Sequence, residues 1–154
     1  RFPVAMDPVP QDAIEHFVDT FVKNRRRGRF GCWLFWARER SGGERHDHFH
    51  CVLLLDGRNT MSAFEHLMVA QRIWALALGL HPSQAQGLVH FCRPDARGHP
   101  NAQEVMLRHD DPDMGRKFQD CFAWASYLAK AYSKDRYVPG ARTFGCSRIP
   151  NNEM

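Results

Sequence analysis

The sequence lacks the features that mark membrane proteins, secreted proteins and thiolate zinc proteins. No apolar run approaches the roughly 20 residues that a membrane helix needs, and no secretory signal pattern opens the chain. The five cysteines are an odd number, are widely spaced and include no Cys-x-x-Cys pair. This usage argues against a disulfide framework and a thiolate zinc site. We therefore expect a protein of a reducing, cytoplasmic setting, with no membrane as partner.

Internal repeats, low-complexity tracts and an obvious linker are also lacking, so the 154 residues are expected to form one domain. Because the sequence opens at Arg1 rather than Met, we expect it to be a segment of a longer protein. Acidic residues are the scarcer charge, which leaves a net charge of +4. The basic excess is concentrated between Lys23 and Arg29. This excess favours an anionic partner, nucleic acid before others.

The spacing of apolar residues predicts three helices. The first begins at Gln11 and ends in the basic run before Gly28. The second follows a possible capping box, Ser62-x-x-Glu65, and continues to Gly79. The third has Pro112 in its first turn and reaches about Ser133.

Strands are predicted at residues 31–39 and 46–55, which form an antiparallel pair, and at 88–92, 105–107 and 142–146. Strands joined by hairpins, with helices interspersed, indicate the α+β class. We expect one antiparallel sheet of about five strands with helices packed on it.

Three alternating histidines open the strand at 46–55. Because successive side chains of a strand point to opposite faces, His46, His48 and His50 share one face, whereas Phe49 and Cys51 point the other way. Neutral imidazoles aligned in this way can ligate a divalent metal ion.

A tyrosine followed by a lysine marks the third helix. At about 100° per residue, an apolar stripe collects on one side of this helix and is expected to be buried; it comprises Phe118, Cys121, Phe122, Ala125, Leu128, Ala129 and Tyr132. Tyr127 lies opposite the stripe, with Lys130 three residues further on. A lysine ammonium favours the phenolate and lowers the pKa of a phenol from about 10. Tyr127 is therefore a candidate nucleophile.

The combination of His48-Phe49-His50 with a helical Tyr-Leu-Ala-Lys segment (127–130) about 75 residues later resembles the HUH endonuclease superfamily. An Arg-x-Phe-Gly-x-Ser element, here Arg142 to Ser147, makes the chain most similar to rolling-circle replication initiators of the inovirus, or filamentous-phage, type. The resemblance covers most of the chain, from about Trp33 to Ser147.

The resemblance implies a ferredoxin-like or RRM-like palm, a single nicking domain, with the histidine strand central in its sheet. His48 and His50 would hold Mg²⁺ or Mn²⁺. We choose Glu39 as third ligand, since it ends the strand expected to pair with 46–55, and keep His46 in reserve. Asp47 points away from the histidines.

The resemblance also implies the reaction. Tyr127 would attack a phosphodiester of single-stranded DNA or of an origin hairpin, giving a 5′-phosphotyrosine and a free 3′-hydroxyl, with Lys130 stabilising the charge. This step would initiate replication of a phage, plasmid or prophage in a bacterial cytoplasm, with a host helicase as possible partner. Tyr132, five residues from Tyr127, is expected to be structural.

DNA contacts are assigned more broadly. Phosphate contacts are expected from two groups of arginines, namely Arg25, Arg26, Arg27 and Arg29 in the basic run and, near the site, Arg142 and Arg148. Trp124 is a candidate for stacking on bases, whereas Trp33, Trp36 and Trp74 are expected in the core.

Several alternatives stay open. An HUH single-strand transposase or a relaxase would share the palm and the tyrosine. A non-catalytic RRM-like domain that binds single strands would need no metal. A metal-dependent hydrolase would use the histidines without a covalent intermediate.

Overall fold

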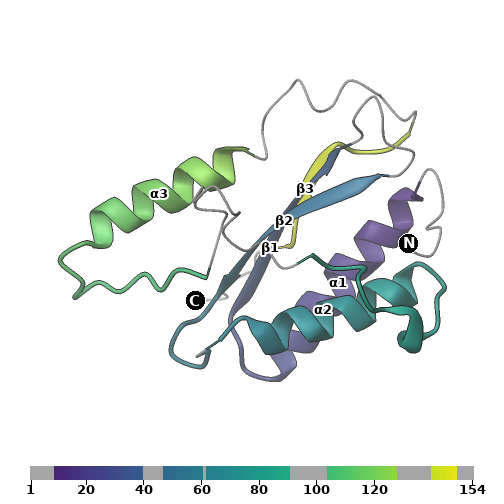
Figure 1. Ribbon diagram of the computed structural model, residues 1–154, viewed down its shortest axis with the longest axis horizontal. Coiled ribbons are helices and arrows are strands. Elements are labelled where there is room, and N and C mark those ends of the chain that lie inside the picture. The colour runs from purple at the N-terminus through teal and green to yellow at the C-terminus, as the bar shows by residue number, and fades with distance from the viewer. Residues whose placement is uncertain (1–8, 40–46, 61, 91–103, 128–139, 149–154) are drawn as a thin grey trace.

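The computed structural model describes residues 9–39, 47–60, 62–90, 104–127 and 140–148 (Figure 1). These ranges contain three α-helices, one 3₁₀ turn and three strands, which confirms the α+β class. In chain order they are α1 (Gln11–Arg27), β1 (Cys32–Glu39), β2 (His48–Leu55), α2 (Phe64–Ala77), η1 (Pro82–Gln84), α3 (Met114–Tyr127) and β3 (Phe144–Cys146). No helix in the described part of the chain is long and apolar enough to cross a membrane.

The first helix has the bounds that its apolar spacing predicts. Its apolar face is buried against the central strand and α2, because Ile14, Phe17, Val18 and Phe21 recur at helical spacing. The core also takes in Leu34 and Trp36 of β1 with Ala70 and Ile73 of α2. Trp74 packs against this core and meets the Phe17 ring edge to face at 5.4 Å.

The sheet is antiparallel in the order β2-β1-β3. Glu39 lies opposite His48 at one end of the β1–β2 pair, and Cys32 lies opposite Leu55 at the other. On its other edge β1 pairs with β3, so β1 is the central strand of the described sheet. The expectation that the histidine strand is central is therefore wrong for this part of the chain.

The expectation of about five strands is only partly met, since the described ranges contain three. Residues 105–107 form no strand with any described part of the chain. Met106 instead lies over Gly57, where a β-carbon would come within 2.7 Å of its sulfur. Leu88 and Val89 lie in a bend, and 91–92 lie outside the described residues.

The start of α2 differs from the expected capping box. Ser62 Oγ accepts a hydrogen bond from Phe64 N at 3.2 Å, not from Glu65. A carboxylate from elsewhere in the chain completes the cap, since Glu104 Oε1 accepts from Ala63 N at 2.8 Å. Negative charge is favourable at a helix N-terminus, so Glu104 ties the segment before α3 to the start of α2.

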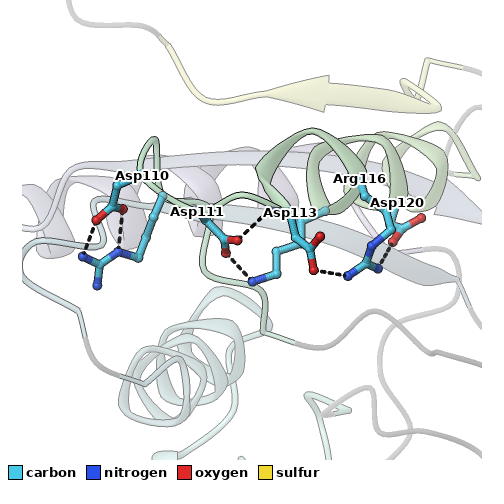
Figure 2. A network of polar contacts seen from close by, with 7 residues as sticks. Asp110, Asp111, Asp113, Arg116 and Asp120 are labelled. Atoms are coloured by element: carbon cyan, nitrogen blue, oxygen red, sulfur yellow. Dashed lines mark hydrogen bonds and ion pairs between the residues drawn. The ribbon is translucent and has the colours of Figure 1, made fainter.

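Ion pairs surround the start of α3 (Figure 2). Arg116 pairs with Asp113 at 3.1 Å and with Asp120 at 3.4 Å, three residues before it and four after it. Asp111 accepts from Asp113 N at 2.8 Å and pairs with Lys117. The hydrogen bond from Lys117 lowers the pKa of Asp111. Pro112 lies in the turn that precedes the helix rather than in its first turn.

No described member of the apolar stripe of α3 is buried, and its two phenylalanines are exposed. Phe118 is 49% exposed and Phe122 is 64% exposed. The helix instead turns a polar face with Trp124 towards residues 104–106, where an open pocket of about 350 Å³ forms. Figure 1 shows α1 and α2 on one side of the sheet and α3 on the other. Leu128, Ala129 and Tyr132, also assigned to the stripe, lie outside the described residues.

The sheet consequently has two different faces. Leu34, Trp36 and Arg38 are buried on the face covered by α1 and α2. The opposite face, called the open face below, carries three exposed apolar side chains: Phe35 at 44%, Leu54 at 49% and Phe144 at 68%. By the strand register its members are Trp33, Phe35, Ala37, Glu39, His48, His50, Val52, Leu54, Phe144 and Cys146.

Candidate functional site

The candidate metal ligands lie at one end of the open face, where two of them, His50 and Glu39, are in contact. His48 and His50 project from β2, and Glu39 ends β1 opposite His48, as the strand pairing predicts. Glu39 Oε2 lies 2.9 Å from His50 Nε2. The His50 side chain is 48% exposed and that of Glu39 is 16% exposed. A carboxylate and an imidazole therefore converge at a position that solvent can reach.

This separation matches the needs of a hard divalent ion. Adjacent ligands of an octahedral ion with bonds of about 2.1 Å lie about 3.0 Å apart. Imidazole nitrogen and carboxylate oxygen are both donors that Mn²⁺ accepts. Within the described ranges no three such side chains converge on one point. His46, the reserve ligand, lies outside these ranges.

A buried ion pair lies on the opposite face, beneath the candidate ligands. Arg38 and Asp47 are the sequence neighbours of Glu39 and His48, and their side chains are 5% and 0% exposed. Arg38 Nη1 lies 3.4 Å from Asp47 Oδ2, which also accepts a hydrogen bond from Val9 N at 3.0 Å. Burial lowers the pKa of Arg38, and the charge of Asp47 partly offsets this effect. Asp47 thus points away from the histidines, as the alternation of the strand predicts.

The candidate nucleophile is the last residue of α3 in the described chain. Tyr127 ends this helix, and Lys130 and Tyr132 lie outside the described residues. Trp124, three residues before Tyr127, lines the pocket between α3 and the 104–106 segment and is only partly exposed.

The arginines of the basic run occupy three different environments. Arg25 is 9% exposed, lies over the Phe30 ring and reaches His66 Nδ1 at 3.4 Å. Arg26 donates from Nη2 to two carbonyl oxygens, those of Cys32 at 3.1 Å and Arg148 at 2.9 Å. Arg27 and Arg29 are exposed.

His66 explains why Arg25 is buried. This imidazole is 2% exposed and meets the Phe30 ring edge to face at 4.8 Å. Burial, reinforced by the charge of Arg25, lowers the pKa of His66. A neutral imidazole can accept a hydrogen bond from the guanidinium, which an imidazolium cannot do. Sequence periodicity places both residues on apolar faces, but no sequence signal pairs them.

The Arg-x-Phe-Gly-x-Ser element forms β3 and its two ends. Ser147 is buried, with its N donating to Leu34 O at 2.8 Å and its Oγ accepting from Leu34 N at 3.1 Å. At Gly145 a β-carbon would lie 2.8 Å from the Trp36 ring, so the strand pairs with β1 only if residue 145 lacks a side chain. The serine and glycine of this element therefore serve strand pairing.

The two arginines of this region lie at opposite ends of the sheet. Arg142 is near the histidine end, where its Nη2 pairs with Glu15 of α1 at 2.9 Å. Arg148 is exposed and follows Ser147, which pairs with Leu34 near the start of β1. Only Arg142 has the expected position near the candidate metal ligands.

Sequence reasoning missed the exposed rings of the open face. Phe35 and Phe144 lie on the same face as His50, and both rings are exposed. The available signal was the alternation of strand residues, which places Leu34, Trp36 and Gly145 on the other face.

The described chain is thus an α+β domain whose antiparallel sheet carries two helices on one face and a His-Glu pair on the other. The sequence model of the YagK/YfjJ C-terminal domain matches residues 18–147. The chain therefore belongs to the YagK/YfjJ C-terminal domain family. No curated protein and no solved structure matches it.

Proposed function

We propose that this protein nicks and rejoins single-stranded DNA through a covalent tyrosyl intermediate, using a divalent metal ion. The observation that carries this proposal is the contact between His50 Nε2 and Glu39 Oε2, at 2.9 Å, on the face that His48 shares. Two imidazoles and a carboxylate at a solvent-exposed strand end suit Mg²⁺ or Mn²⁺ better than a structural zinc site.

His48, His50 and Glu39 would hold the ion, which supplies electrophilic polarisation of a phosphate when bound. The contact between His50 Nε2 and Glu39 Oε2 keeps the two side chains together, and the ion would take the place of this contact, because a ring nitrogen that ligates a metal cannot also donate a hydrogen bond. The buried pair of Arg38 and Asp47 restrains the ends of both strands, so that Glu39 stays in register with His48.

Tyr127 is the proposed nucleophile. Its phenolic oxygen forms a bond to phosphorus while the bond from phosphorus to the 3′ oxygen breaks, and the departing 3′ oxygen takes up a proton. The 5′-phosphotyrosine keeps the ester bond, so a 3′-hydroxyl can later attack phosphorus and release Tyr127. Lys130 is assigned to stabilising the phenolate and the phosphate charge.

A free 3′-hydroxyl is also a primer, which connects this chemistry to the start of rolling-circle replication of a phage, plasmid or prophage in the bacterial cytoplasm. The resemblance of the two motifs to HUH initiators supports this role, and a host helicase is the expected partner. Arg27 and Arg148 are exposed and available for phosphate contacts, whereas Arg25 is bonded to His66.

The first test is formation of a covalent adduct. The protein is incubated with single-stranded DNA oligonucleotides and Mn²⁺, and the products are separated on a denaturing gel. We expect an adduct that disappears with EDTA and in Tyr127→Phe but persists in Tyr132→Phe. An adduct that survives Tyr127→Phe would show that another residue is the nucleophile.

The second test is calorimetry of Mn²⁺ binding. His50→Ala and Glu39→Gln should each weaken binding by roughly tenfold or more, since each removes a proposed ligand and even the loss of a ligand's hydrogen-bond partner costs at least about tenfold. His90→Ala is the matched control, because His90 is exposed and lies outside the sheet. Equal affinities in all three variants would refute the metal assignment.

A second candidate function is single-strand binding without turnover. The exposed rings of Phe35 and Phe144 on the open face favour it, since bases can stack on such rings. It predicts that DNA binds equally well with EDTA and that no adduct forms with any oligonucleotide.

A further inference from the structure

The open face carries aromatic rings in a line from the His-Glu pair to the far end of the sheet. We propose that this line is the path of single-stranded DNA, with bases stacked on Phe144 and Phe35 and a phosphate held by Arg148. The proposal deepens the proposed function, because it names the surface that leads the strand to the histidines.

The register gives the order of side chains along this path. Starting from His48 and Glu39, the next row holds His50 and Phe144 on either side of Ala37. Phe35 follows, between Val52 and Cys146. At about 3.4 Å per residue the rows from Glu39 to Trp33 span about 20 Å.

The backbone bonds of Ser147 extend this order to the basic end. Because Ser147 pairs with Leu34 through both its N–H and its hydroxyl, the next residue, Arg148, falls opposite Trp33. By the alternation of Phe144, Cys146 and Arg148, the arginine belongs to the open face. It is exposed, whereas Ser147 is buried.

The far end of the path is positively charged. Arg26 bonds to the carbonyl of Arg148, so two arginines meet there, and Arg29 is tied to the same end through Asn59. Asp56 lies at this end but is paired with Arg58 at 2.6 Å, so the two charges offset each other. The described residues of this end therefore carry excess positive charge, which suits a phosphate backbone.

The combination of exposed rings and cations on the open face favours single-stranded DNA over a protein partner. Phe144 is 68% exposed and Phe35 is 44% exposed, and they are diagonal neighbours on adjacent strands, about 7–8 Å apart. Successive bases of an extended strand can each lie on one such ring, and every base offers a stacking surface. The cations at the end of the path give the phosphates of such a strand a partner, which an apolar protein surface would not need.

The test measures binding of a fluorescein-labelled thymidine oligonucleotide of about ten nucleotides, by fluorescence anisotropy in EDTA. Without metal no nicking occurs, so binding is measured separately from the proposed chemistry. Phe144→Ala and Phe35→Ala should each raise the Kd about tenfold, the loss of one stacked base. Arg148→Ala should reduce the slope of log Kd against log salt by about 0.7, one phosphate contact on a single strand.

Phe122→Ala is the matched control. It removes a ring of similar exposure, 64%, from α3 instead of from the sheet, and its Kd should stay within about twofold of the unaltered protein. Unchanged Kd values in both sheet variants would overturn the path. An equal loss in Phe122→Ala would also overturn it, since binding would then use α3.

Sedimentation of the DNA-free protein tests whether a second copy of this chain covers the open face instead of DNA. A dimer that dissociates in Phe144→Ala would overturn the proposal, because the rings would then form a contact between copies. Ring-dependent binding without any adduct would support the path and refute the proposed nicking function. An adduct that forms although binding does not depend on the rings would support the nicking function and refute the path.

Discussion

Removal of the Arg38 guanidinium should destabilise the fold far more than removal of an exposed cation. The Arg38 side chain is 5% exposed, Asp47 is 0% exposed, and Arg38 also lies 5.0 Å above the Phe49 ring. In Arg38→Met the aliphatic stem remains, but Asp47 keeps a buried carboxylate without this cation. Breaking a buried pair in this way costs about 3–5 kcal/mol.

The long separation within the pair, 3.4 Å, favours the lower end of that range. We expect the free energy of unfolding to fall by about 3 kcal/mol. With a urea dependence of about 2 kcal/mol per molar for a small domain, the midpoint should fall by more than about 1 M. Urea unfolding followed by tryptophan fluorescence and by circular dichroism measures both quantities.

Two further variants make this prediction refutable. Lys23→Met breaks an exposed pair with Asp19, in which both side chains are more than 60% exposed, and should cost less than about 0.5 kcal/mol. The double variant Arg38→Met with Asp47→Asn removes both charges and should recover at least half of the loss, because no charge stays buried. A loss in Arg38→Met no greater than in Lys23→Met would refute the reasoning.

Three other predictions concern single side chains. Gly145→Ala should cost about 1–3 kcal/mol in urea unfolding, because its β-carbon would lie 2.8 Å from the Trp36 ring; unchanged stability would show that β3 shifts freely. Because the pKa of His66 is lowered in the folded state, unfolding should become easier as the pH falls below about 6.5, and His66→Gln should flatten that slope; an identical slope would contradict the assignment. Burial raises the pKa of Cys32 to about 11, so at pH 8 Ellman's reagent should modify exposed Cys51 quickly and Cys32 only on unfolding; equal rates would contradict it.

The sequence predicted most of what local periodicity controls. The bounds of α1, the antiparallel pair β1–β2 and the shared face of His48 and His50 all follow from a period of 3.6 or 2. Glu39 was placed by the same rule, since it ends a strand that must pair with the histidine strand.

What depends on contacts distant in sequence could not be predicted in this way. The neutral His66 that receives Arg25 lies 41 residues away, and the carboxylate that caps α2 comes from Glu104. When only its own residues are considered, a basic run is expected to be a solvated helix end. Arg25 is buried because α2 packs against α1 and brings His66 to it.

The third helix shows a different limit. Its apolar stripe, including Phe118 and Phe122, satisfies the periodicity of a buried face, but periodicity only says that a face is apolar and not what covers it. In this structure the contacts of α3 come from its other side, through Trp124 and Lys117. A helical wheel gives the direction of Tyr127 around its own helix, but it cannot place Tyr127 relative to histidines on a strand.

The central position of β1 has a consequence for how the gene can change. This one strand supplies Trp36 and Arg38 to the buried face and Phe35 and Glu39 to the open face. An insertion or deletion of one residue inside β1 would exchange the two sets, so that a carboxylate moves to the buried face and an arginine takes its place beside the histidines. A change of length between Glu39 and His48 leaves both alternations intact. Relatives of this chain should therefore vary in length between these two strands but never within the first.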